Sequence, residues 1–229
     1  MRISRPQAWR IIASRYPPVD LFERVSGGSS AISDALIALE QRTNKRVRDE
    51  IGEIALVPPE RRVSGPGASY VMAPFTHVNP SGSRFADGSY GAYYAALEIE
   101  TALAETIHHF ERFARDSGDP PRSEDMRVLV GAFDAEVEDL TAEAAPRRAR
   151  LLDPNDYSVS QGWARRLRDK GANGIFYPSV RRAGGACVVA FWPDVPAIPI
   201  QERHLQYHWD GKRVDRYFDY GEDVWVDWA

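Results

Sequence analysis

The spacing of apolar residues predicts a long amphipathic helix near the middle of the chain. Ile99, Leu103, Ile107 and Phe110 recur at helical intervals between about residues 98 and 115. Such a stripe is expected to face the core, with polar residues on the other face.

Three further helices are predicted from shorter patterns. Residues 30–42 have apolar positions at helical spacing. Residues 159–170 form another such run, which is expected to end at Gly171 in a left-handed cap. Residues 5–15 are predicted to form a short helix, because the prolines that follow would stop it.

Short apolar runs between turn residues predict the strands. The expected strands cover residues 51–58, 70–72, 90–96, 126–133, 137–140, 174–177 and 186–192. Near the C-terminus, Asp210 and Gly211 lie between two alternating runs, which is the signature of a tight hairpin. Helices and strands that do not strictly alternate predict an α+β fold.

Composition adds a few limits to this picture. A chain of 229 residues can bury a core without a disulfide or metal, and its one cysteine, Cys187, allows no internal disulfide. No apolar run is long enough to span a bilayer, so we expect no membrane contact and a cytoplasmic location. The formal net charge of -4 argues against direct binding of nucleic acid.

Candidate chemistry gathers between residues 82 and 109. A glycine-rich loop within residues 61–91 carries Arg84, and Tyr93 and Tyr94 follow in a predicted strand. Glu105 lies on the predicted helix, away from its apolar stripe. From the helix alone, a solvated surface with salt bridges explains Glu105 better than catalysis does.

Other motifs exclude several site classes. The five histidines lack the spacing of a ligand set, so no metal site is expected. The glycine-rich segments match neither a P-loop nor a dinucleotide fingerprint. Ser179 is not in a nucleophile elbow, which favours a hydrogen-bonding role for it.

Five sequence blocks together resemble the RES domain, over roughly residues 60–210. They are GSRF, YGAYYAA, ETALAE, GANGIFYPSVR and GGACVVAFWP, in that order. The resemblance implies a toxin made beside an Xre-type antitoxin in a bacterial toxin–antitoxin system. It also implies a fold similar to ADP-ribosylating toxins, and consumption of NAD+ with transfer of ADP-ribose to water, phosphate or a protein.

The resemblance also assigns residues. It makes Arg84, Tyr94, Glu105 and Ser179 the site residues, within a RES domain at residues 61–229. The first 60 residues are expected to be a helical extension that forms one compact unit with that domain. They could serve the antitoxin or a contact within a homodimer. Many RES proteins have Trp-Asn after the arginine where this chain has Phe-Ala, and a further family arginine could correspond to Arg24 or Arg62.

The chemistry of NAD+ suits these residue types. The guanidinium of Arg84 can bind phosphate or ribose oxygens in a bidentate way, and Glu105 can stabilise the positive charge that develops on the ribose. The ring of Tyr93 or Tyr94 can stack on the nicotinamide. Ser179 is expected to donate to the nicotinamide amide or a ribose hydroxyl, and Arg181 is counted with the cofactor-binding residues.

Two other functions remain open from the sequence. A toxin ribonuclease could use histidine, glutamate and arginine in acid–base cleavage. A non-catalytic module could bind a partner through the aromatic C-terminal segment. If the chain does consume NAD+, we expect an antitoxin to contact the 61–90 loop.

Overall fold

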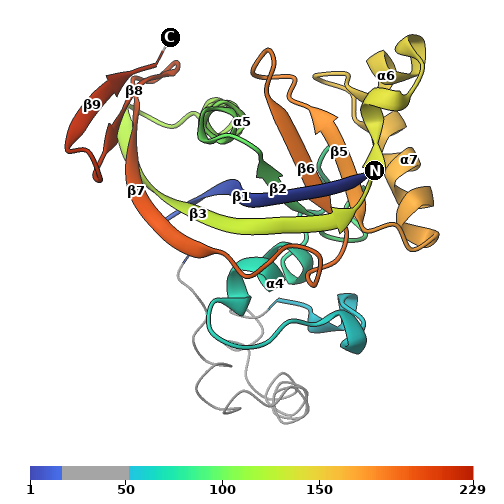
Figure 1. Ribbon diagram of the computed structural model, residues 1–229. Coiled ribbons are helices and arrows are strands. Elements are labelled where there is room, and N and C mark those ends of the chain that lie inside the picture. Colours follow the sequence, from blue (N-terminus) through green and yellow to red (C-terminus); the bar gives the residue numbers. More distant parts are fainter. Residues whose placement is uncertain (17–51, 229) are drawn as a thin grey trace.

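The computed structural model describes residues 1–16 and 52–228, which form one curved sheet with helices packed on it (Figure 1). The helices within these ranges are α4 (Ala68–Thr76), α5 (Ile99–Ser117), α6 (Ala145–Leu151) and α7 (Ser158–Asp169). Three 3-10 turns accompany them: η1 (Ile54–Leu56), η2 (Pro59–Arg61) and η3 (Leu140–Ala142). No helix in the described part of the chain is both long and apolar enough to cross a bilayer.

The sheet has nine strands in the order β4-β5-β6-β2-β1-β3-β7-β8-β9. All neighbours pair antiparallel except β4 and β5. The strands are β1 (Arg2–Ala13), β2 (Tyr93–Ala96), β3 (Arg122–Glu136), β4 (Glu138–Asp139), β5 (Gly174–Pro178), β6 (Ala186–Ala190), β7 (Ile200–Trp209), β8 (Val214–Asp219) and β9 (Val224–Asp227). The predicted α+β class is confirmed.

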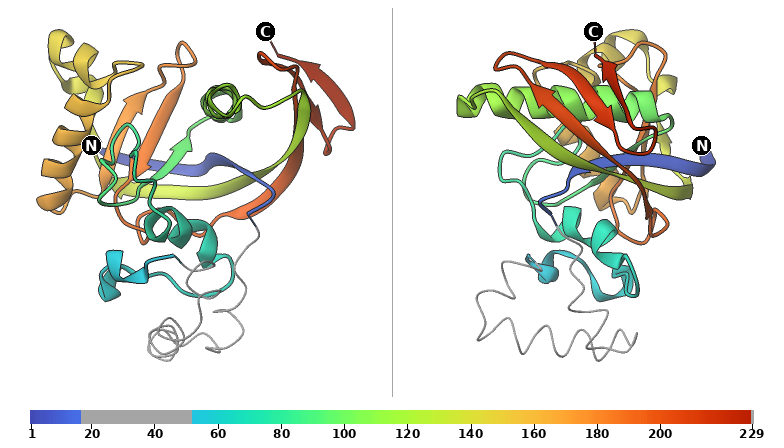
Figure 2. Two further views of the ribbon diagram at one scale, coloured as in Figure 1. Left: turned by 180° about the vertical axis from the view of Figure 1, so that it is seen from behind. Right: turned by 90° about the vertical axis from the view of Figure 1, so that its left-hand side faces the viewer.

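Two apolar cores cover the two faces of this sheet. Helix α5 lies on the concave face, and α4 lies on the opposite face (Figures 1 and 2). The core on the α5 side includes Leu103 and Ile107 of the helix. The core on the α4 side includes Val71 and Phe75. Residues that alternate along a strand therefore enter different cores.

The predicted helix at residues 5–15 is wrong, because this segment lies in β1. Strand β1 pairs with β3 over most of its length and with β2 at Trp9 and Ala96. Both faces of β1 pack on a core, so its apolar residues do not alternate with polar ones. The first 13 residues thus belong to the central sheet rather than to a helical extension.

Two predicted strands before the sequence block GSRF are also wrong. Residues 54–56 form a 3-10 turn, and residues 70–72 lie inside α4. Helix α4 contains Pro74, which hides its helical pattern in the sequence. The predicted helix at residues 30–42 lies outside the described residues.

The other described elements that were predicted match closely, whereas α6 and β9 were not predicted from the sequence. Helix α5 covers the predicted residues, and α7 is followed by Gly171 with a φ of 83°. Asp210 and Gly211 connect β7 to β8 as an antiparallel hairpin. Strands β2, β3, β5 and β6 lie where apolar runs predicted them, and β4 covers the middle of the predicted strand at 137–140.

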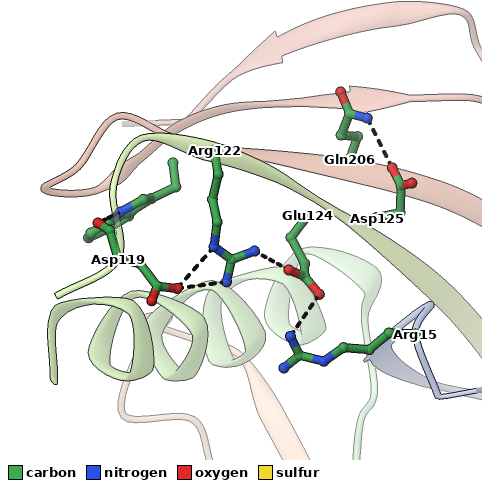
Figure 3. Close-up of polar contacts among 7 residues, drawn as sticks. Arg15, Asp119, Arg122, Glu124, Asp125 and Gln206 are labelled. Atoms are coloured by element: carbon green, nitrogen blue, oxygen red, sulfur yellow. Dashed lines mark hydrogen bonds and ion pairs between the residues drawn. The ribbon is translucent and has the colours of Figure 1, made fainter. Parts of the chain in front are cut away.

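A charged network ties the C-terminal end of α5 to the start of β3 (Figure 3). Arg122 donates from Nε to Asp119 at 2.9 Å and also pairs with Glu124. Arg15 contacts the other oxygen of Glu124 at 3.4 Å. The Arg122 guanidinium also lies 5.1 Å from the ring centre of Phe110, on α5. The network therefore fixes one end of the helix that carries Glu105.

Candidate active site

The two tyrosines of β2 face opposite sides of the sheet. Tyr93 is 2% exposed within the core on the α4 side, under the guanidinium of Arg10. Tyr94 packs against the core on the α5 side. Glu105 extends from α5, so Tyr94 shares its side of the sheet and Tyr93 does not. Of the two alternatives for stacking on a nicotinamide, the structure places Tyr94 and not Tyr93 on the side of Glu105, and cofactor binding stays a prediction.

The hydroxyl of Tyr94 holds the loop that carries Arg84. Phe85 N donates to the Tyr94 oxygen at 2.9 Å, and the Ser83 hydroxyl lies 2.8 Å from the same oxygen. The residues on both sides of Arg84 are thus fixed by one side chain. Gln161 of α7 adds a third contact by donating to the Ser83 carbonyl at 3.0 Å. Burial raises the pKa of Tyr94 to about 12, so its phenol stays protonated.

Arg84 is a buried cation without a carboxylate partner in the described part of the chain. Its side chain is only 8% exposed, and Nη1 donates to the Asp153 carbonyl at 2.7 Å and to the Leu151 carbonyl at 3.5 Å. The ring of Tyr157 lies 4.6 Å from the guanidinium carbon. Among the described residues, Nε and Nη2 donate to no protein atom. Two of the three nitrogens therefore remain available to a ligand.

Glu105 is half-buried on α5 and forms no ion pair with any described residue. Oε1 accepts a hydrogen bond from the Ser179 hydroxyl, with 2.6 Å between the two oxygens. Within residues 1–16 and 52–228, Oε2 accepts no hydrogen bond. The carboxylate is thus anchored through one oxygen and free at the other.

The turn between β5 and β6 brings Ser179 and two arginines to the same place. Arg181 donates from Nη2 to the Pro154 carbonyl at 2.8 Å, beside the carbonyl that accepts from Arg84. Arg182 reaches the start of α5, where it contacts Thr101 at 3.2 Å and Glu98 at 3.4 Å. The turn therefore packs on both α5 and the segment between α6 and α7.

The charges of Arg84 and Glu105 act on the same buried groups. Burial raises the pKa of the Tyr177 phenol and of the Cys187 thiol, and Glu105 raises both further. Arg84 lowers both pKa values. Contacts also link the two residues: Arg84 and Arg181 donate to the adjacent carbonyls of Asp153 and Pro154, and the Arg181 amide donates to the same Ser179 oxygen that bonds Glu105. The structure thus brings together the two residues that the sequence proposed as catalytic.

Comparison with known proteins identifies the family. The RES domain model matches residues 59–210 of this chain, which is more than half of it. The chain belongs to the RES domain family.

Two similar proteins accompany this match. "Uncharacterized protein y4oC" of Sinorhizobium fredii (strain NBRC 101917 / NGR234) is 28% identical over 215 residues, covering 92% of this chain and 86% of that protein. A chain in the crystal structure of the M. tuberculosis MbcT–MbcA toxin–antitoxin complex is 12% identical, with a TM-score of 0.43. That match covers 92% of this chain and 87% of the other.

In this RES domain, four of the six sequence-derived site residues converge, Tyr94 contacts them through the Arg84 loop, and Tyr93 lies on the other face of the sheet. Arg84, Glu105, Ser179 and Arg181 surround the segment between α6 and α7 and the start of the β5–β6 turn. Tyr94 supports the Arg84 loop, because its hydroxyl is bonded to the Ser83 hydroxyl and to the amide of Phe85.

Sequence reasoning missed two residues of the site. Tyr157 supports the Arg84 guanidinium, but the proline-containing segment before α7 gave no signal for it. His109 lies one helical turn after Glu105, on the same helix α5. The protein around the His109 ring lowers its pKa, and Arg181 adds to this effect while Glu105 opposes it. The i, i+4 spacing of Glu105 and His109 was the available signal.

Proposed function

We propose that this RES domain is a toxin that consumes NAD+. It cleaves the bond between nicotinamide and ribose and transfers ADP-ribose to an acceptor. The N-glycosidic bond breaks, nicotinamide leaves as a neutral molecule, and a new C–O bond forms at the same ribose carbon. The acceptor is water, phosphate or a protein side chain, and its proton passes to solvent.

The observation that carries this proposal is the pair of unmatched charges. Arginine and glutamate are rarely buried without a partner, because desolvating a charge costs free energy that an ion pair or ligand must offset. Arg84 has no carboxylate and Glu105 no cation in the described part of the chain, although two carbonyls and the Tyr157 ring hold Arg84 and the Ser179 hydroxyl holds Glu105. A ligand with anionic and cationic parts would satisfy both residues, and NAD+ carries a pyrophosphate and a pyridinium.

The proposed roles follow from the chemistry of each group. Nε and Nη2 of Arg84 donate to phosphate or ribose oxygens. Oε2 of Glu105 faces the ribose, where it stabilises the oxocarbenium character of the transition state. Tyr94 acts indirectly, by fixing the loop on both sides of Arg84.

The partner and location are part of the same proposal. An enzyme that drains NAD+ would poison its host, so the resemblance to RES toxins supports an Xre-type antitoxin as its partner. The segment that follows α4, residues 77–90, carries Arg84, and a protein bound over it would obstruct the site. Because NAD+ is consumed where it is abundant, we place the protein in the cytoplasm.

One assay tests the reaction. The purified chain is incubated with labelled NAD+, with and without phosphate, and nicotinamide, free ADP-ribose and labelled protein are measured. We expect nicotinamide release, and the second product identifies the acceptor. Cleavage of added RNA without nicotinamide release would instead support the ribonuclease alternative.

Glu105→Gln tests the carboxylate. The substitution keeps the size and helix propensity of the side chain but removes the negative charge. We expect NAD+ turnover to fall at least about 100-fold, the usual effect of losing one electrostatic partner of the transition state. Glu100→Gln on the same helix is the matched control, because Glu100 is exposed. If the turnover of Glu105→Gln stayed within twofold of the control, Glu105 would be a solvated surface residue and not a catalytic one.

A further inference from the structure

The oxygen of Ser179 has no hydrogen-bonding capacity left. Arg181 N and Arg182 N donate to Oγ at 3.1 and 3.0 Å, and Oγ donates to Glu105 Oε1 at 2.6 Å. A hydroxyl has one proton and two lone pairs, so these three bonds use all of it. The sequence-based expectation that Ser179 donates to a nicotinamide or ribose group would require breaking its bond to Glu105.

The direction of the Glu105 bond is fixed by the other two. Both backbone amides can only donate, which occupies the lone pairs of Oγ and leaves its proton for the carboxylate. A hydrogen bond from a hydroxyl to a carboxylate at 2.6 Å is of the strong, charge-assisted class. The turn therefore acts through Ser179 to hold the Glu105 carboxylate in one orientation.

The turn itself is held against the helix that carries Glu105. Arg182 contacts Thr101 and Glu98 at the start of α5, and Ser179 N donates to the Gly185 carbonyl at 2.8 Å across the turn. Gly185 packs so closely on Thr101 that an added Cβ would lie 2.4 Å from the Thr101 hydroxyl oxygen. Ser179 and Glu105 are thus parts of one rigid unit, although they are 74 positions apart in the chain.

We propose that Ser179 is a positioning residue, which anchors Oε1 of Glu105 so that Oε2 points to the reacting ribose, and that it does not bind NAD+ itself. The kinetic consequence rests on the proposed function, but the orientation of Glu105 does not. The two can therefore be tested separately.

The structural test uses three substitutions and no substrate. Ser179→Ala removes the proton and the acceptor. Ser179→Asp keeps an acceptor for the two turn amides but has no proton to donate to Glu105. Ser179→Thr keeps both. Crystal structures should show the Glu105 carboxylate displaced in the Ala and Asp variants and unmoved in the Thr variant. A carboxylate that stays in place in Ser179→Ala would overturn the proposal.

The kinetic test separates positioning from binding. We expect Ser179→Ala to lower kcat by roughly tenfold to a hundredfold, the cost typical of misplacing a catalytic group by about 1 Å. The Kd for NAD+, measured by calorimetry with and without Ser179→Ala on a Glu105→Gln background that does not turn over, should differ by less than twofold, and Ser179→Thr should restore kcat. A raised Kd with unchanged kcat would mean that Ser179 contacts NAD+, and would overturn the proposal.

A matched control removes a hydroxyl of similar geometry from a turn outside the candidate site. Thr141 donates to Asp139 at the same distance of 2.6 Å, in η3 beside the edge strand β4. Thr141→Ala should leave both kcat and Kd unchanged, and an equal loss there would overturn the specific role of Ser179. A wild-type protein that releases no nicotinamide would refute the proposed function, and the Glu105 conformers would still decide the role of Ser179.

Discussion

At the scale of single residues, each of the two proposed catalytic charges is held by a neighbouring hydroxyl. Tyr94 fixes the residues beside Arg84, and Ser179 fixes one oxygen of Glu105. Neither hydroxyl is needed to fill space. These hydrogen bonds fix the two charged groups and leave Nε and Nη2 of Arg84 and Oε2 of Glu105 available to a ligand. Groups that are held in place before the substrate binds accelerate a reaction because they need not reorganise.

Arg84→Lys should weaken NAD+ binding while the fold survives. Lysine keeps the charge but loses the planar fork that can contact carbonyls and a ligand together. We expect affinity to fall about tenfold or more, as for the loss of one hydrogen bond to a charged group. Calorimetry on a Glu105→Gln background measures this without turnover. Arg150→Lys, at an exposed position of α6, is the control, and equal affinities would mean that Arg84 only braces its loop.

Tyr94→Phe should destabilise the protein through the Arg84 loop. The change keeps the ring but leaves the amide of fully buried Phe85 without its acceptor. An unsatisfied buried donor costs about 1–3 kcal/mol, and urea unfolding should show a loss of free energy in that range. Tyr16→Phe is the control, because Tyr16 is 59% exposed. A variant as stable as this control would show that the Tyr94 hydroxyl does not hold the loop.

At the scale of elements, the sequence predicted α5 and the strands after it but failed at β1 and α4. Helix α5 has one apolar and one polar face, so its period is visible. Strand β1 is covered on both faces and has a register shift between Arg5 and Ala8, so neither period appears. Similarly, the sequence could propose Arg84 and Glu105, but not Tyr157, whose role depends on how the segment before α7 folds back.

Helix α5 should also make stability depend on pH. Burial, together with Arg181 and His109, lowers the pKa of His108 from 6.5 to about 4. Between pH 6.5 and pH 4, His108 is therefore protonated in the unfolded chain but mostly neutral in the folded chain. The contribution of neutral His108 to the free energy of unfolding is fully present above pH 6.5. It is lost as the pH falls from about 6.5 towards 4.

The variant His108→Gln isolates this effect. We expect its free energy of unfolding to fall less steeply than that of wild type between pH 7 and pH 5, as measured by urea titration at each pH. Because His109 adds to the lowered pKa of His108, the difference between the two profiles reports the titration of His108 together with its interaction with His109. Parallel pH profiles would show that the His108 ring titrates normally in the folded protein.

At the scale of the whole molecule, the fold extends beyond the segment that matches the RES domain model. That segment covers residues 59–210, whereas β1 lies at residues 2–13 in the middle of the sheet. Without β1, the strands β2 and β3 would lose the strand between them and expose backbone groups on both sides of the gap.

A chain limited to residues 59–210 should therefore not fold. We expect it to be insoluble or to lack a cooperative thermal transition by circular dichroism. A chain ending at residue 222 is the control, because it loses only β9, a four-residue strand at the edge of the sheet. A cooperative transition in the 59–210 chain would show that β1 is dispensable.

The central place of β1 has a consequence for synthesis of the protein on the ribosome. The amino group of Met1 donates to the carbonyl of Val137, 136 positions later, and at about 5–20 residues per second this separation takes roughly 7 to 27 seconds to translate. Arg84 and Glu105 emerge before β3, the long partner of β1, and Ser179 emerges after it. An unfinished chain thus holds both charged residues without the sheet or the turn that aims them. On the proposed function, a nascent toxin is harmless until translation is nearly complete, and the antitoxin needs to act only on the finished chain.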